Sequence, residues 1–341
     1  MSTQGRARKG RATIGDVARV AGVSKATASR ALNDSPAVTE ATKEKVRAAV
    51  VETGFVRNAQ GRALAMGRAE SIAILFTEPL DEFFADPTYA SVLRGITEGL
   101  SGTRTMPMLV QAWTDLEHQR ALRQFERRAV DAVISISPYV GGDMLEALAA
   151  GSLPVVLCGQ LEGDPYGEVF SSVYADDVAG ATLAANRMLR RGRGRIAVIN
   201  GPQDNPAAAD RLSGYSTTLG ERFDPDLSVS TGWDSASGFT AMRQLLAAAP
   251  DLDGVLAASD RIALGALGAL ALAGRSVPGD VSVIGFDDHA LAAASDPPLT
   301  TVHQPLRRQG AIAATMALDM VNGEPARRTI LEMSLVERDS V

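Results

Sequence analysis

The stretch from Ala12 to Asn33 constrains the fold of this chain most, because it reads as two short helices joined by a tight turn. Thr13 is a candidate N-cap with Asp16 three positions further on, which resembles a capping box. Gly22 ends the first helix, and Ser24 caps the second. Apolar residues recur at helical spacing at Ile14, Val17, Ala18 and Ala21. The pattern predicts a helix-turn-helix, whose second helix enters the DNA major groove; the alternative is an ordinary helical hairpin on a globular surface.

The charge of the chain is divided unevenly between this first segment and the rest. Residues 1–68 hold 13 Lys and Arg against 5 Asp and Glu, a net charge of +8. The remaining residues hold 21 basic against 35 acidic side chains, a net charge of −14. A basic head on an acidic body favours contact between that head and a polyanion such as DNA.

From Ser71 onward the pattern changes to short apolar runs separated by helical stretches. This alternation is typical of parallel sheets with right-handed crossovers, and 341 residues leave room for two or three domains. The predicted strands are 71–76, 107–112, 130–135, 155–159, 195–200, 254–258 and 281–286, and the tail adds a helix at 306–321 and a strand at 329–335. We expect two α/β lobes with a cleft between them.

The sequence lacks the motifs of catalysis, metal binding and membrane insertion. Residues 192–197 spell part of a dinucleotide fingerprint, but they precede a predicted strand instead of following one, so we reject that reading. Lone Cys158 fits a reducing cytosol and makes no thiol active site. The longest uncharged apolar run, 262–274, is too short to span a bilayer. We therefore expect a cytoplasmic protein that is not an enzyme, binds no cofactor and does not contact a membrane.

Ligands of open α/β sheets bind beyond the carboxyl ends of the strands, so residues that follow strands are candidates for binding. Asp287 comes directly after the strand at 281–286, and Asp260 follows the strand at 254–258. Each also has a plain structural reading, because Asp commonly caps the next helix. For Asp260 we favour the capping role.

Residues 58–67 connect the head to the lobes and allow two interpretations. Asn58 can cap a short helix, but about ten residues with Gly61 among them form only a marginal helix alone. The alternative is a plain linker.

Two blocks of the head resemble the opening of the LacI/GalR family of transcriptional regulators. The first block, 13–33, reads Thr-Ile-Gly-Asp-Val-Ala-Arg-Val-Ala-Gly-Val-Ser-Lys-Ala-Thr-Ala-Ser-Arg-Ala-Leu-Asn, and the second, 38–58, ends in Thr-Gly-Phe-Val-Arg-Asn. The resemblance implies an all-α helix-turn-helix head and an α/β two-lobed, periplasmic-binding-protein-like (type I) core with parallel sheets. It assigns the head to 1–57, a hinge helix and linker to 58–69, the N-terminal lobe to 70–174 with 304–325, and the C-terminal lobe to 175–303 with 326–341.

The resemblance also implies which residues contact DNA. Lys25 and Ala26 match the two family positions that read bases, and Arg30 matches a base-contacting arginine one turn further on. In the connector, Leu64 matches the leucine that the family wedges into the minor groove, and Asn58 stands at the start of that segment. The side chains better suited to phosphate contacts are Ser24, Thr27, Ser29 and Asn33.

For the effector, the resemblance points to residues of both lobes. Arg211 lies in a stretch similar to the one that places an arginine on the ligand, and Trp233 stands where relatives put an aromatic ring over it. The first-lobe segment that contributes contacts holds Phe84, Asp86 and Tyr89. Carboxylates, an arginine and a flat ring suit the hydroxyls and the C–H face of a sugar. The plain alternatives are a surface ion pair for Arg211 and core packing for Trp233.

We therefore predict a DNA-binding transcriptional regulator, in its simplest form a repressor that grips a pseudo-palindromic operator as a homodimer. A small-molecule effector, a sugar or an oligosaccharide, would bind between the lobes and change the angle between them. Two alternatives stay open: a solute-binding protein of a transport system, which shares the two-lobed core, and a regulator co-repressed by a nucleobase.

Overall fold

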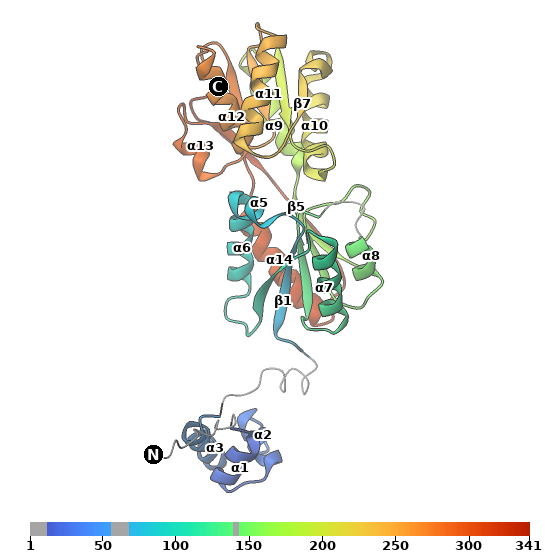
Figure 1. The fold of residues 1–341 in the computed structure, drawn as a ribbon, viewed down its shortest axis with the longest axis vertical. Helices are drawn as coiled ribbons and strands as arrows, with labels where there is room; N and C mark the ends of the chain where they lie inside the picture. The colour runs from blue at the N-terminus through green and yellow to red at the C-terminus, as the bar shows by residue number, and fades with distance from the viewer. Residues whose placement is uncertain (1–11, 56–67, 139–142) are drawn as a thin grey trace, which may run out of the picture. The chain divides into compact units, whose positions relative to one another are not determined.

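A computed structural model describes residues 12–55, 68–138 and 143–341 (Figure 1). The chain divides into two compact units, Met1–Ala69 and Glu70–Val341. Among the described residues, every helix is too short or too polar to cross a lipid bilayer.

The head consists of three helices around a small core. Its described helices are α1 (Ile14–Ala21), α2 (Lys25–Leu32) and α3 (Glu40–Thr53). Thr13 and Asp16 form the capping box of α1, because each side chain bonds the backbone N–H of the other. Gly22 ends α1 with a φ of 68°, in the left-handed region that glycine adopts without strain. Small apolar side chains fill the interior: Val17, Ala31, Val46 and Ala49.

The N-terminal lobe is a six-stranded sheet in the order β11-β5-β4-β3-β1-β2, in which every neighbouring pair is parallel. Its strands are β1 (Ser71–Phe76), β2 (Met106–Gln111), β3 (Ala132–Ile136), β4 (Val155–Cys158), β5 (Ser171–Ala175) and β11 (Arg328–Leu331). Its helices are α5 (Leu80–Ala85), α6 (Pro87–Gly99), α7 (Asp115–Glu126), α8 (Asp143–Ala149) and α14 (Leu306–Val321). Helix α14, red in Figure 1, packs on the strands of this lobe although it lies near the end of the chain.

The C-terminal lobe repeats this plan in a sheet ordered β12-β10-β9-β8-β6-β7. Its strands are β6 (Ile196–Asn200), β7 (Ser228–Ser230), β8 (Gly254–Ala257), β9 (Ser282–Asp287), β10 (Thr300–His303) and β12 (Ser334–Val336). The pairing of β10 with β12 is antiparallel, and the other pairings are parallel. Its helices are α9 (Asp177–Arg190), α10 (Pro206–Leu219), α11 (Ser235–Ala248), α12 (Asp260–Leu272) and α13 (Ala290–Ala294), with short 3-10 turns at Gly220–Arg222 and Pro225–Leu227.

The chain crosses between the lobes after β5, after β10 and after β11. The sequence predicted one strand at 329–335 and assigned 326–341 to the C-terminal lobe, and both expectations need correction. Arg328–Leu331 forms β11 and pairs with β5 in the N-terminal sheet, whereas Ser334–Val336 forms β12 and pairs with β10 in the other. The third crossing therefore falls between Leu331 and Ser334, because the two halves of the predicted strand at 329–335 pair with strands of different sheets.

Glycines let helices α6 and α14 approach each other at backbone distance. A methyl group at Gly95 would overlap the carbonyl of Arg307, and one at Gly310 would overlap the carbonyl of Val92. The N-terminus of α6 lies next to the second crossing, since Pro87 lines the same pocket as Gln304 and Pro305.

Candidate functional site

The first candidate site is the exposed face of α2 in the head. Ser24 caps this helix, since its hydroxyl accepts the Thr27 N–H at 3.0 Å, so the residues after it start a defined helix. Lys25, Ala26 and Arg30 are exposed, and neither cation forms an ion pair with a described residue. The N-terminus of a capped helix suits a polyanion, and Lys25 in the first turn and Arg30 in the last turn add two exposed cations.

The remaining predicted DNA contacts fall into two groups. Ser24 and the C-cap residue Asn33 are exposed, while Thr27 and Ser29 are half-buried. Asn58 and Leu64 lie outside the described residues.

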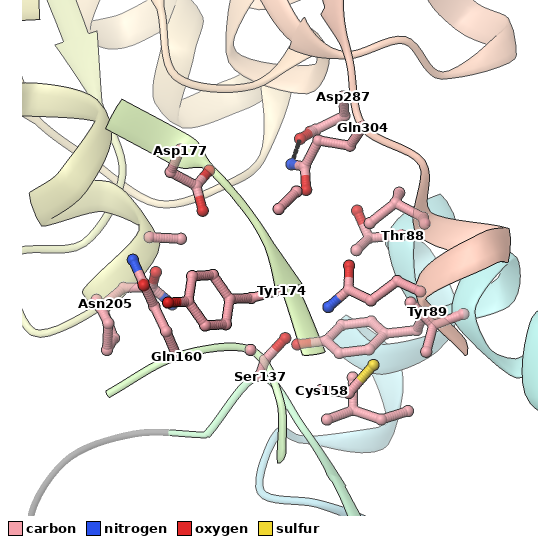
Figure 2. A pocket seen from close by; sticks show the side chains of 18 of the residues that line it. Thr88, Tyr89, Ser137, Cys158, Gln160, Tyr174, Asp177, Asn205, Asp287 and Gln304 are labelled. Atoms are coloured by element: carbon pink, nitrogen blue, oxygen red, sulfur yellow. Dashed lines mark hydrogen bonds between the residues drawn. The ribbon is translucent and has the colours of Figure 1, made fainter. Parts of the chain in front are cut away.

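The second candidate site is a cavity between the lobes of the core, at the carboxyl ends of both sheets (Figure 2). Tyr89 and Gln160 line it from the N-terminal lobe, and Asn205, Arg211 and Asp287 from the C-terminal lobe. This is the position at which open parallel sheets bind ligands.

Arg211 is the centre of this site and is almost fully buried. Its Nε donates to Asp177 Oδ1 at 2.7 Å, and its Nη1 donates to Asp287 Oδ1 at 3.3 Å. The guanidinium also lies 3.9 Å from the centre of the Phe286 ring and 5.5 Å from that of Trp233. Burial works to lower the pKa of Arg211, but the two carboxylates outweigh it and raise that pKa. Arg211 is thus neither a surface residue nor a free ligand contact, but the cation of a buried network.

Asp287 projects into the cavity from a turn that begins at the end of β9. Its φ is 102°, and that of Asp288 is 58°, so both residues adopt backbone conformations that are rare for side chains other than glycine. This turn sends the two carboxylates apart. Asp287 accepts a hydrogen bond from Gln304 Nε2 at 2.6 Å (Figure 2), whereas Asp288 pairs with Arg338 away from the cavity.

The N-terminal lobe contributes Tyr89 and Asp86, but Phe84 lies elsewhere. Tyr89 lines the cavity and stacks on Phe83, with 4.6 Å between ring centres. Asp86 caps α6 and pairs across the cleft with Arg261 at 3.2 Å. Phe84 is 70% exposed and is not among the described residues that line the cavity. The short helix α5 directs Phe83 inward, so the aromatic ring that supports the site is the neighbour of the one we predicted.

Trp233 lines the cavity on the C-terminal side, and its position depends on Gly201. A methyl group at Gly201 would overlap the indole ring, so only glycine leaves room for Trp233 over the end of β6. The ring is half-buried and also packs on the core of this lobe. Both interpretations of Trp233 therefore apply: one side of the ring packs, and the other lines the cavity.

Asp260 lies behind the site and is not among the described residues that line it. Ser259 takes the capping position of α12, while Asp260 accepts the His289 N–H at 2.7 Å and bonds Thr301 Oγ1 at 2.5 Å. Burial, together with the charge of Asp287, raises the pKa of Asp260 to about 8. Its carboxyl is therefore mostly neutral at pH 7 and holds the turn that carries Asp287 and His289.

Several lining residues were missed by the sequence reasoning. Most of them follow strands or begin helices at the carboxyl ends of the sheets, as the rule for open sheets requires. They are Thr88, Ser137, Gln160, Tyr174, Asp177, Asn205, Gln304 and Gln309. Cys158 also lines the cavity, and burial raises the pKa of its thiol to about 12, so it is not a nucleophile at neutral pH.

The cavity offers hydrogen-bond donors and acceptors without an excess of positive charge. Arg211 is matched by Asp177 and Asp287, and Arg261 is matched by Asp86. Amides and hydroxyls supply the remaining polar groups. Such a lining suits a neutral molecule with many hydroxyl groups and disfavours a phosphate or a carboxylate.

Two family models match the chain. The model described as bacterial regulatory proteins, lacI family, matches residues 13–58, and the model described as periplasmic binding protein-like domain matches residues 185–341. These matches agree with the helix-turn-helix head and the two-lobed core predicted from the sequence.

Relatives resemble the chain over nearly its whole length. The HTH-type transcriptional regulator CelR of Thermobifida fusca is 36% identical over 338 residues, which cover 98% of this chain and 99% of the relative. The HTH-type transcriptional repressor PurR of Photobacterium profundum is 30% identical over 340 residues, covering 97% and 98%.

Solved structures agree with the sequence relatives. A transcriptional regulator CelR–cellobiose complex matches with a TM-score of 0.77 at 35% identity, over 97% of this chain and 100% of that one. The lac repressor dimer bound to operator and the anti-inducer ONPF matches with a TM-score of 0.85 at 26% identity, over 97% and 99%.

Proposed function

Because the chain belongs to the LacI family of bacterial regulatory proteins, we propose that it is a transcriptional repressor whose hold on operator DNA is controlled by a sugar bound between the lobes. The predicted family and the predicted regulatory role are confirmed by relatives that are transcriptional regulators, and those relatives are not enzymes. A transport protein is not favoured, since the match to DNA-binding regulators includes the head. The cytoplasm, where operator DNA lies, is the proposed location.

The observation that carries the sugar proposal is the composition of the interlobe cavity. Its cation is fully matched by carboxylates, and amides, hydroxyls and the ring of Trp233 supply the rest of the lining. A pyranose presents hydroxyls at its edge and C–H groups on its faces, which these groups match. The CelR–cellobiose complex shows a related protein with a sugar, in support of the same ligand class here.

Control of DNA binding requires the sugar to prefer one arrangement of the lobes. The cavity takes groups from both lobes, and three crossings join them, so a ligand that touches both sides favours the lobe angle that completes its contacts. We propose that this angle sets the separation of the two connectors in a dimer and so the grip on the operator. By reciprocity, operator DNA then weakens sugar binding by the same factor by which the sugar weakens DNA binding.

A homodimer fits both the operator and the surface of the core. Strand β2 is an edge strand whose Met106, Met108 and Leu109 are about half exposed or more. An exposed apolar edge strand is normally covered by a partner. A twofold dimer places two heads on a pseudo-palindromic site, where we propose that Lys25 and Arg30 read bases and that Leu64 wedges between base pairs.

The test is a thermal-shift screen of the full chain against monosaccharides, oligosaccharides and purines. A sugar at 100 times its Kd adds about 2.7 kcal/mol of stability to the state that binds it, which is readily detected. The same sugar should release a duplex that the protein has selected from a random-sequence pool. Gln160→Ala should lose the shift because Gln160 lines the cavity, and Gln119→Ala, on the exposed face of α7, is the matched control. If purines raise the unfolding temperature and sugars do not, the proposed sugar effector is wrong and the ligand class is nucleobases.

A further inference from the structure

A second, larger cavity opens next to the first, also between the lobes. Its volume is about 810 Å³, against about 120 Å³ for the inner cavity. Asp86, Tyr89, Pro138 and Trp233 line both, so the two cavities meet at these four side chains. A ligand that fills the inner cavity can therefore continue into the outer one without leaving the cleft.

The lining of the outer cavity includes an exposed aromatic side chain, Trp113. Trp113 follows β2 and is 57% exposed, an unusual exposure for the largest apolar side chain. Its backbone N–H donates to Glu117 Oε2 at 3.2 Å, and Thr114 caps α7 in a capping box with the same Glu117. The turn that carries Trp113 is thus held in place by hydrogen bonds, so its indole is presented on a fixed support. Trp233, which also lines the inner cavity, is the second indole in the lining of the outer one.

A histidine in the same lining has an unused polar atom. His118 lies on α7, and its Nε2 is buried without a hydrogen-bond partner among the described residues. A buried ring nitrogen without a partner is costly, so a turn of the His118 ring that brings Nε2 to a ligand hydroxyl in the cavity would gain a hydrogen bond. A sugar hydroxyl can serve, since it both donates and accepts.

The charge of the lining excludes anionic ligands. Carboxylates from Glu82, Asp204 and Asp234 join that of Asp86, while Arg261 is already paired with Asp86. An acidic lining repels phosphorylated sugars and sugar acids and accepts neutral glycosyl units.

We propose that the outer cavity is a second subsite, which binds further neutral glycosyl units of the effector between Trp113 and Trp233. The effector is then a disaccharide or a longer neutral oligosaccharide, and a monosaccharide fills the inner cavity alone. This inference rests on the proposed sugar control of the chain and adds the length of the ligand. The alternative is that the outer cavity is the solvent-filled mouth of the cleft.

The experiment compares each monosaccharide with its own oligomers by calorimetric titration of the full chain. Glucose is paired with cellobiose and cellotriose, xylose with xylobiose and xylotriose, and glucose with maltose as a change of linkage. In the series that binds, the disaccharide should bind at least tenfold more tightly than the monosaccharide, the factor that about 1.4 kcal/mol of added contact provides.

Variants test whether the tighter binding of the disaccharide comes from contacts in the outer cavity. Trp113→Ala should remove most of the gain from the second unit and leave monosaccharide affinity unchanged, whereas Trp113→Phe should keep part of it. His118→Ala should weaken the disaccharide, and His118→Gln should restore it by supplying a polar atom at similar reach. Leu116→Ala is the matched control, because this exposed residue of α7 is not among the described residues that line either cavity.

The outcomes separate this inference from the proposed function. If no saccharide binds, both the proposed sugar control and the proposed second subsite are wrong. If saccharides bind but the monosaccharide equals its oligomers, or Trp113→Ala weakens both alike, the second subsite is wrong while sugar control stands.

Discussion

Replacing Arg211 by methionine should lower the free energy of unfolding of the core, whether or not a sugar is present. Methionine keeps apolar contact with Phe286 but leaves the buried carboxylates of Asp177 and Asp287 without their cation. Removing one partner of a buried ion pair costs about 3–5 kcal/mol, and Arg211 is only 5% exposed, so solvent screening gives little relief. At about 2 °C per kcal/mol for a large domain, the core transition should fall by about 6–10 °C.

Thermal unfolding of the full chain by circular dichroism measures this loss, and neutral partners test its cause. In the Arg211→Met background, Asp177→Asn and Asp287→Asn together should recover at least half of the lost stability, because no buried charge is left unpaired. Lower pH should also recover part of the stability that Arg211→Met loses. Burial already raises the pKa of both carboxyls, Arg211 opposes that rise, and its loss raises each pKa further. The folded variant then holds protons that the unfolded chain releases, so its stability should increase as pH falls toward 5.

Two results would refute this reasoning about Arg211: an unchanged transition in Arg211→Met, or a loss that persists in full in the triple variant. The triple variant also separates the two roles of the residue. It should remain folded yet fail to bind the sugar that stabilises the parent, because it lacks both the Arg211 cation and the Asp287 carboxylate that line the cavity.

Three further changes test other parts of the chain. Asp260→Asn should match the parent near pH 4 and exceed its stability at pH 8. Because the folded parent keeps the Asp260 carboxyl protonated up to about pH 8, its free energy of unfolding falls by up to about 1.4 kcal/mol per pH unit between pH 4 and pH 8, and parallel urea midpoints across that range would contradict this. Gly201→Ala should displace Trp233 and weaken sugar binding in titration while operator affinity stays the same; equal sugar affinity would place the indole outside the site. Leu64→Ala should weaken operator binding by about 1–3 kcal/mol in fluorescence polarisation and spare non-specific DNA binding, and an equal loss on both would remove the wedge role.

The sequence predicted the strands that are apolar and missed those that are not. The runs at β1, β4 and β6 are continuous apolar segments, and each was predicted within a residue or so of its observed bounds. Strands β5 and β10 were missed because each begins with two hydroxyl residues, Ser171–Ser172 and Thr300–Thr301, although both strands are buried. Their hydroxyls bond neighbouring segments, as Thr301 does with Asp260, so burial of these strands depends on partners far away in the sequence.

The dependence on distant partners also explains which residues of the candidate site were predicted and which were missed. Asp287 was found because it follows an apolar strand, while Asp177 and Gln304 were missed because they follow β5 and β10. The choice between Phe83 and Phe84 depends on the direction in which a six-residue helix packs, which two adjacent identical residues do not reveal. Local pattern therefore predicts which sheet edge carries the site, and tertiary contacts decide which side chains reach it.

The two halves of the cleft differ in how firmly they are held, and this difference suits a switch. On the C-terminal side, Arg211 and Asp287 are fixed by a buried ion pair, and Asp287 also accepts a hydrogen bond from Gln304 at the second crossing. Across the cleft, Asp86 pairs with Arg261, and Thr88 bonds His289 Nε2 at 3.1 Å, so both contacts break when the lobes separate. Because these cross-cleft contacts break when the lobes separate, a ligand that binds the two arrangements with different affinities can shift the balance between them. One half of the cleft stays fixed and selects the sugar, and the contacts of the other half depend on the lobe angle, as control of a distant DNA contact requires.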